Sequence, residues 1–253
     1  MPGMLMPTLK LLRLASHLLA GSLTILLLFP RLDQHQRRHR VTRWAAQLLE
    51  LLDIRVEVIG RPPPLRGGGV LLAANHVSWL DIHLLYSLLP ARFISKAEVR
   101  DWPLFGWFAV ATGTVFLVRE KKSDAKRVNQ LMAELLRAGD CLALFPEGTT
   151  SDGSGLLPFF PSLFQPVVDA EAAVWPATIR YLNSDGTPCI EAAYYGHMSL
   201  GESLRKILKL RGLRARVEFL PPIASQGLAR RDLARASEAA IRAAMAPRDM
   251  AHS

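Results

Sequence analysis

Short apolar runs of strand length alternate with helical patterns through most of the chain, and this alternation restricts the possible folds more than any other feature. The strand-like runs are 54–60, 70–75, 92–95, 113–118, 141–145, 174–181, 190–195 and 214–220, and the helical patterns are about 81–89, 103–112, 124–138, 200–211 and 226–245. Several of the runs are apolar throughout, which indicates strands buried on both faces. We therefore expect an α/β fold with a layered mixed, largely parallel sheet flanked by helices.

The N-terminal part has a different pattern. Residues 11–29 are strongly apolar, an arginine-rich tract follows at 31–43, and a second helical pattern covers 41–53. A signal peptide is the alternative, but no small-residue cleavage site follows the leucine-rich run. Arginines beside an apolar helix keep their segment on the cytoplasmic side and attract anionic lipid. We expect residues 1–53 to form an apolar helical hairpin that anchors an α/β domain, 54–253, to the cytoplasmic face of the inner membrane, either spanning it or entering one leaflet.

The chain of 253 residues carries a formal net charge of +9. Such a surface suits polyanions, whether nucleic acid, anionic lipid headgroups or an acidic carrier protein. Cys141 and Cys189 lie far apart and match no metal or redox spacing, so we expect two reduced thiols in a cytosolic compartment. The oligomeric state is not determined by these features.

A polar turn directly follows one of the buried strands. In LLAANHVSWLDIHLL (71–85) the strand ends at Asn75, His76 comes next, and a helix begins near Trp79. Side chains at the carboxyl end of such a strand project into the crevice where α/β sheets bind ligands. His76 and Asp81 can meet only if His76 lies in the turn and Asp81 reaches back from the first helical turn. Asp81 would then hold one imidazole nitrogen while the other acts as a general base on a hydroxyl.

The same segment also has a purely structural interpretation. Ser78 and Asp81 fit a helix-capping pair, and His76 could be an ordinary loop histidine. A second buried strand, 141–145, ends in the polar turn PEGTTSDG, and two such turns favour an active-site crevice. Glu147 is placed to bind polar groups of a substrate, and Gly148 permits close backbone approach. A capped helix N-terminus is the alternative for this second turn.

NHVSWLD (75–81) and FPEGTTSDG (145–153), in this order and about seventy residues apart, resemble the glycerolipid acyltransferase family, which includes the 1-acylglycerol-3-phosphate acyltransferases. That family carries an Asn-His-x4-Asp segment followed later by Pro-Glu-Gly-Thr. ISKAEVRDWPLFGW (94–107), GTVFLVR (113–119) and VWPATIRY (174–181) are also similar to stretches of the family. The resemblance covers roughly residues 50–195.

The resemblance implies an O-acyltransferase that moves a fatty acyl chain from acyl carrier protein or coenzyme A to the free hydroxyl of a membrane lysolipid, with no cofactor. It makes His76 the base and Asp81 its partner. Arg119 would contact an anionic headgroup, and Lys96 would line the same cleft. The full expected substrate site is Asn75, Lys96, Arg119, Glu147, Gly148, Thr149 and Thr150.

One departure from the family bears on the acceptor. Many members that acylate glycerol phosphates have arginine where this chain has Thr150, and the change removes a bidentate phosphate contact. The segments AANHVSW, KAEVRDWP and FPEGTTSDG are similar to the bacterial branch that acylates lyso-ornithine lipid. Lysophosphatidate and lyso-ornithine lipid therefore both stay open as acceptors.

Other classes fit less well. The sequence has no Gly-x-Ser-x-Gly element of a serine hydrolase, and no further ligand joins His76 and His83 in a zinc site. A basic nucleic-acid or membrane-surface binder is the strongest non-enzyme alternative. We expect no nucleic acid as partner, because the arginines lie beside the apolar anchor and along 226–245 without interleaved aromatic residues.

Overall fold

The computed structural model describes residues 5–64, 68–118 and 122–246. Within these residues, eight strands form one sheet in the order β1-β7-β6-β2-β5-β3-β4, with β8 paired to β6. The strands are β1 (Ile54–Ile59), β2 (Val70–Ala74), β3 (Arg92–Lys96), β4 (Val115–Leu117), β5 (Cys141–Leu144), β6 (Ala173–Leu182), β7 (Leu213–Phe219) and β8 (Ile223–Ala224). Pairing is parallel except where β6 meets β7 and β8. The predicted mixed, largely parallel sheet is confirmed.

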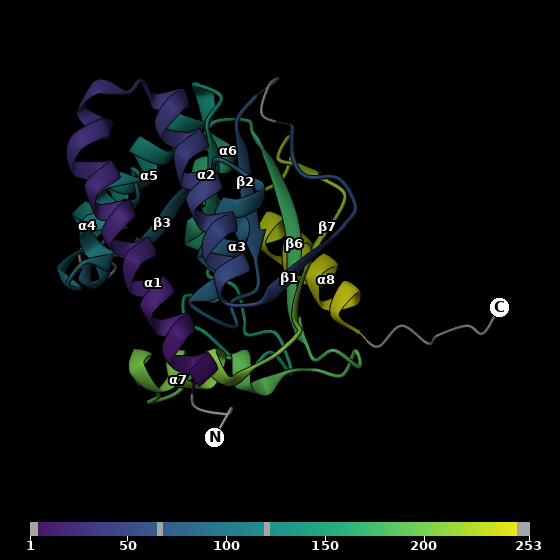
Figure 1. Cartoon of the computed structure of the whole chain (residues 1–253). Coiled ribbons are helices and arrows are strands. Elements are labelled where there is room, and N and C mark those ends of the chain that lie inside the picture. The colour runs from purple at the N-terminus through teal and green to yellow at the C-terminus, as the bar shows by residue number, and fades with distance from the viewer. Residues whose placement is uncertain (1–4, 65–67, 119–121, 247–253) are drawn as a thin grey trace.

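Helices cover both faces of this sheet (Figure 1). The α-helices are α1 (Leu5–Leu23), α2 (Gln34–Leu51), α3 (Leu80–Leu88), α4 (Phe105–Ala111), α5 (Lys122–Arg137), α6 (Gln165–Asp169), α7 (Leu200–Lys209) and α8 (Arg230–Met245). Helices α2, α3 and α7 bury their apolar sides in one core cluster, and α5 and α8 do so in the other. The result is a three-layer α/β/α arrangement.

The central strand β2 shows how the two cores are built. Alternate strand residues point to opposite faces, so Leu72 and Ala74 join the cluster under α2 and α3 while Leu71 and Ala73 join the cluster under α5. All five residues of β2 are buried. The strand therefore has no polar position until it ends, and the first polar side chains after it lie at the carboxyl edge of the sheet.

The N-terminal helices form the expected hairpin. The helix α1 runs on through a π-helical segment (η1, Thr24–Leu28) and a short 3₁₀ turn (η2, Phe29–Arg31), and Pro30 lies where the chain leaves the helix. Asp33 then starts α2 with a reciprocal capping box to Gln36. One helical stretch of the described residues, Thr8–Arg31, is long and apolar enough to cross a membrane by length and composition. The N-terminal apolar helix expected from the sequence is present.

Two details differ from the expected elements. Residues 190–195 do not form a strand: Ile190–Ala192 is a 3₁₀ turn (η5), and the chain continues as an irregular segment. Its apolar character arises because Ala192 and Ala193 are fully buried against the helical layer rather than in the sheet. The hairpin helices are also longer than expected, since α1 begins at Leu5 and α2 at Gln34. The remaining 3₁₀ turns are η3 (Ala97–Asp101) and η4 (Pro161–Phe164).

Candidate active site

Asn75 fixes the direction in which the chain leaves β2. Its side-chain amide donates to the carbonyl of Ile179 at 3.0 Å, and its carbonyl oxygen accepts from the backbone N–H of Ile179 at 2.7 Å. The Asn75 side chain thus makes the two hydrogen bonds to β6 that a further backbone residue of β2 would otherwise make. Asn75 is 1% exposed, so both ends of its amide are occupied inside the protein. Its geometry is that of a residue that positions the turn.

His76 and Asp81 meet as the spacing predicts. His76 lies in the turn, Asp81 lies in the first turn of α3, and Nδ1 of the imidazole is 2.7 Å from Oδ2 of the carboxylate. Because an ionised carboxylate can only accept, this contact places the proton on Nδ1 and leaves the lone pair on Nε2. Within the described residues no group hydrogen-bonds to Nε2. The His76 side chain is 17% exposed.

The carboxylate of Asp81 is fully buried and receives four hydrogen bonds. Oδ2 accepts from His76 and from the backbone N–H groups of Val77 and Ser78 at 2.7 and 2.9 Å. Oδ1 accepts from the hydroxyl of Tyr181 at 2.7 Å. The two backbone N–H groups lie at the start of α3, where the helix dipole also favours a negative charge. A charge buried this completely requires such a set of donors.

Both sequence interpretations of Asp81 therefore hold at once. Asp81 caps the turn before α3 and also orients the imidazole. The capping pair is incomplete in one respect, because the buried Oγ of Ser78 has no hydrogen-bond partner. The pair is joined instead through the backbone: the N–H of Ser78 donates to Oδ2 of Asp81 at 2.9 Å, and the N–H of Asp81 donates to the carbonyl of Ser78 at 3.0 Å.

The loop after β5 holds His76 from the other side. The ring of Phe145 stacks on the imidazole, with centroids 3.8 Å apart and planes 4° from parallel. Glu147 accepts from the backbone N–H of His76 at 2.7 Å, and the backbone N–H of Ser151 donates to the carbonyl of His76 at 2.9 Å. The imidazole is thus fixed by a stacked ring, a carboxylate and two backbone bonds. The two polar turns predicted to lie at one edge of the sheet do so.

Glu147 is 3% exposed, and its two oxygens bind two different backbone groups. Oε1 accepts from His76 and Oε2 from Leu157 at 2.8 Å, so the side chain ties the β2 turn to the loop that follows β5. Burial raises the pKa of Glu147, and the two backbone N–H groups partly offset this by favouring the ionised form. In this geometry Glu147 holds the two loops of the site together.

The other predicted substrate residues surround this loop. Gly148 has a φ of 71°, a left-handed conformation that glycine adopts at little cost. Thr149 is exposed and Thr150 is half-buried on the same turn. Lys96 is exposed at the end of β3. Arg119 lies outside the described residues. Substrate contact by any of these residues, including Asn75, remains a prediction.

Comparison with known proteins identifies the chain's relatives. Residues 55–180 match the family model described as Acyltransferase. A lyso-ornithine lipid O-acyltransferase from Pseudomonas aeruginosa is 42% identical over 217 residues, which cover 85% of this chain and 82% of that protein. The chain belongs to the acyltransferase family. It is an enzyme that transfers acyl groups, as the sequence analysis predicts.

Two further relatives of this acyltransferase extend the comparison. A 1-acyl-sn-glycerol-3-phosphate acyltransferase from Neisseria meningitidis serogroup B is 39% identical over 184 residues, covering 73% of this chain and 71% of that protein. The crystal structure of the 1-acyl-sn-glycerophosphate acyltransferase from Thermotoga maritima has a TM-score of 0.69, covering 96% of this chain and 95% of that one. At 19% identity the latter establishes a shared fold.

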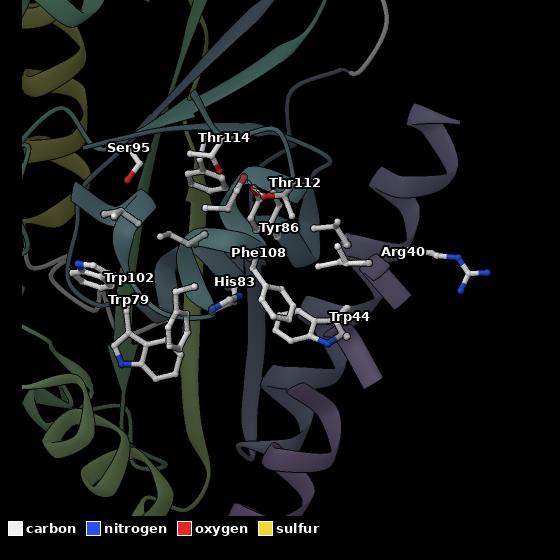
Figure 2. A pocket seen from close by; sticks show the side chains of 18 of the residues that line it. Arg40, Trp44, Trp79, His83, Tyr86, Ser95, Trp102, Phe108, Thr112 and Thr114 are labelled. Carbon is white, nitrogen blue, oxygen red and sulfur yellow. Dashed lines mark hydrogen bonds between the residues drawn. The ribbon is translucent and has the colours of Figure 1, made fainter. Parts of the chain in front are cut away.

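The acyltransferase has an apolar cavity of about 160 Å³ next to its candidate site. The walls come from α1, α2, α3, β3 and α4, and Figure 2 shows tryptophan, phenylalanine and tyrosine rings around it. His76 does not line the cavity. Phe93 does, and its ring centroid is 5.9 Å from that of Phe145, which stacks on His76. Two aromatic rings thus separate the cavity from the imidazole.

One polar side chain in the cavity wall lacks a partner. Nδ1 of His83 is buried and has no hydrogen-bond partner among the residues that the structure describes, and the ring lies edge-on to both Trp44 and Trp79. Burial lowers the pKa of His83 to about 4, so the ring is neutral near pH 7. The described residues contain no group of three His, Cys, Asp or Glu side chains that could hold a metal ion.

Sequence reasoning missed Tyr181 and Phe145 as parts of the site. Tyr181 lies 100 residues beyond Asp81 and reaches it only because β6 pairs directly with β2. Phe145 directly precedes the Pro-Glu-Gly-Thr segment, but its aromatic ring reads as one more core residue. One sequence feature could have indicated both residues: each lies at the end of a strand that the sequence predicts to be buried.

Proposed function

We propose that the acyltransferase moves a fatty acyl chain from an acyl thioester to the free hydroxyl of a membrane lysolipid, with His76 as general base. The observation that carries this proposal is the 2.7 Å contact between His76 Nδ1 and Asp81 Oδ2, which orients the imidazole so that no described residue hydrogen-bonds to Nε2. The names of the relatives support a lysolipid acceptor.

In the proposed reaction, Nε2 of His76 takes the proton of the acceptor hydroxyl while that oxygen attacks the thioester carbonyl carbon. Asp81 stabilises the imidazolium that forms. The tetrahedral centre then collapses, the carbon–sulfur bond breaks, and the leaving thiolate takes up the proton from His76. General base catalysis of this kind contributes roughly 10²–10⁴-fold. The acceptor is itself the nucleophile, so the mechanism needs no acyl-enzyme and no cofactor beyond acyl carrier protein or coenzyme A as donor.

We propose that the buried residues of the site position its backbone and that the exposed residues contact the substrate. Asn75 and Glu147 use their polar atoms on backbone groups, which supports a positioning role next to the substrate. Lys96, Thr149 and Thr150 are at least partly exposed and are available to an acceptor headgroup. The predicted contact between Arg119 and an anionic headgroup belongs to the same proposal.

Two acceptors fit this chemistry. A lysophosphatidate would be held through its phosphate, and the Neisseria relative is named for such an acceptor. Lyso-ornithine lipid is favoured by Thr150, whose hydroxyl offers no guanidinium for a phosphate, and by the Pseudomonas relative. The loss of the arginine bears directly on headgroup recognition, which makes Thr150 the position to test.

We further propose that residues 1–53 place the domain 54–253 on the cytoplasmic face of the inner membrane, with α1 lying along the surface. Leucines are exposed along α1 and the η1 segment that continues it: Leu9, Leu11, Leu12, Leu19 and Leu23 on α1, and Leu26, Leu27 and Leu28 on η1. Helix α1 is also tied to α2, where His17 stacks on Trp44 at 4.7 Å and the two residues exchange hydrogen bonds with each other's backbone. A spanning α1 would carry the arginines of α2 into the bilayer core, which is costly.

Such a position suits a lipid substrate. Extracting a lysolipid chain into water costs about 0.8 kcal/mol per methylene group, whereas an enzyme at the bilayer surface can accept the chain from the side. We propose that the apolar cavity lined by α1 and α4 holds methylene groups of an acyl chain, which keeps them out of water. The exposed arginines of the tract 31–43, Arg31, Arg40 and Arg43, would contact anionic headgroups, whereas Arg38 is paired with Asp140.

An acceptor panel tests the proposed function. Purified protein receives one labelled acyl thioester and either lysophosphatidate or lyso-ornithine lipid in vesicles. Product with at least one of the two supports the proposal, and the ratio of rates identifies the acceptor. The matched variant Thr150→Arg should shift this ratio toward lysophosphatidate. Failure of the wild-type protein to acylate either lipid would contradict the proposal.

A further inference from the structure

Helix α4 and the turn before it present an apolar surface that acyl transfer does not explain. Leu104 is 37% exposed, Trp107 40% and Val110 47%. These residues recur at intervals of three and lie along one side of the helix. The opposite side, including Phe105 and Phe108, lines the apolar cavity. Helix α4 is therefore apolar on both sides, although only one of them is covered by protein.

The backbone at the start of α4 is held in an unfavourable conformation. Leu104 has a φ of 64° and a ψ of −53°, outside the regions that a residue with a branched side chain normally occupies. Leu104 is only partly covered by protein, so burial in the interior does not account for this strain. Strain of this kind persists where the surroundings or a function require it.

This exposed surface adjoins α1, and the inference rests on the membrane position proposed above for that helix. Phe108 of α4 approaches α1 at Gly21, where an added Cβ would lie 3.2 Å from its ring, and the two helices lie at the same edge of the molecule (Figure 1). Figure 2 shows Phe108 of α4 beside Trp44 of α2, the helix that packs against α1 in the hairpin. Trp102 is 43% exposed just before α4. Exposed tryptophans next to an apolar membrane helix are typical of the bilayer interface.

We propose that the α4 surface, Leu104, Trp107 and Val110, is a second membrane contact that enters the bilayer interface beside α1. The charges in the adjoining turn nearly balance, because Lys96 and Arg100 are accompanied by Glu98 and Asp101. Insertion at α4 is therefore driven by apolar contact and occurs in zwitterionic as well as anionic vesicles. A water-soluble partner or a second copy of the chain are the competing occupants.

Spin labels measure this contact without reference to catalysis. One variant carries Val110→Cys, and the matched control carries Val58→Cys on β1, at the opposite edge of the sheet, where the native valine is 45% exposed. Cys141 and Cys189 are buried, which favours selective labelling of the introduced thiols. In phosphatidylcholine vesicles, we expect the label at 110 to be more accessible to oxygen than to a water-soluble nickel chelate, and the label at 58 to show the reverse.

Two results of the spin-label experiment would overturn the proposal. Equal accessibility of the labels at 110 and 58 to the nickel chelate would show a solvated surface, and protection of the label at 110 from both reagents would show a protein contact. Fluorescence provides a second measurement: brominated lipid should quench the wild-type protein more than Trp107→Phe, whereas Trp175→Phe, which removes a tryptophan of β6, should not reduce quenching. Equal quenching of wild type and Trp107→Phe would also contradict the proposal.

Discussion

The hydroxyl of Tyr181 supports the site through a single bond whose removal has a calculable effect. Tyr181 is 4% exposed, and its hydroxyl donates at 2.7 Å to Oδ1 of Asp81, an oxygen with no other donor in the described residues. A hydrogen bond to a charged group contributes about 1.5–3 kcal/mol. Tyr181→Phe keeps the ring but leaves one oxygen of a buried carboxylate unpaired. We expect the free energy of unfolding to fall by about 2 kcal/mol.

The same variant should lower turnover less severely. Oδ2 of Asp81 keeps its bonds to His76, Val77 and Ser78, so the imidazole stays near its position. We expect kcat to fall about tenfold, equivalent to about 1.4 kcal/mol of lost transition-state stabilisation. Urea unfolding followed by circular dichroism in detergent measures the first effect, and acyl transfer from a labelled thioester measures the second.

Tyr86→Phe is the matched control for stability. Tyr86 is also buried and also donates through its hydroxyl, but to the neutral Oγ1 of Thr112 at 3.1 Å. A neutral hydrogen bond contributes about 1 kcal/mol, so this variant should lose about half as much stability as Tyr181→Phe. If the two variants lose the same stability and Tyr181→Phe turns over at the wild-type rate, Asp81 does not depend on Tyr181 and the reasoning is wrong.

Three further substitutions test separate parts of the site. Asp81→Asn offers one acceptor to four donors, so kcat should fall about 10³–10⁴-fold; a folded variant within tenfold of wild type would contradict the orienting role. Glu147→Gln can accept from only one of two backbone N–H groups and should lower the free energy of unfolding by about 2 kcal/mol, measured by urea unfolding. For His83, the folded pKa of about 4 lies below the unfolded value of 6.5, so the unfolded chain binds the proton first as pH falls and stability is lost between pH 6.5 and 4. Relative to His83→Phe, wild type should lose about 3 kcal/mol over that range; parallel pH dependence of the two proteins would refute the assignment.

The contact at the centre of the site was accessible from the sequence because it is local. A fully apolar run ending at Asn75 marks the edge of the sheet, and the five-residue spacing of His76 and Asp81 allows contact in one geometry only. Both facts depend on neighbours in the chain. The structure has that geometry, with the carboxylate reaching back from the first turn of α3.

The parts that sequence could not supply depend on which strands lie side by side. Tyr181 reaches Asp81 through the pairing of β6 with β2, and no pattern within 174–181 states that pairing. Glu147 points inward for a related reason: two backbone N–H groups from different loops converge on it. From sequence alone, a glutamate in a polar turn is expected at the surface, because the positions of those two loops are not known.

The segment 190–195 shows the limit of apolar patterning. Buried residues of a short irregular stretch give the same apolar run as a strand. Here the backbone N–H of Tyr194 donates to the carbonyl of Val77 at 2.8 Å, so the stretch packs against the turn that holds His76 without joining the sheet. A strand would have needed a free edge, and both long sides of β6 are already paired, with β2 and β7.

The most direct test of the account is acyl transfer by His76→Ala. Wild type and variant are compared in vesicles that contain a lysolipid acceptor, with one labelled acyl thioester and with circular dichroism to establish that both are folded. The account predicts that the variant keeps its fold and loses turnover by about 10³-fold or more. A folded His76→Ala protein that transfers acyl groups within tenfold of the wild-type rate would contradict it.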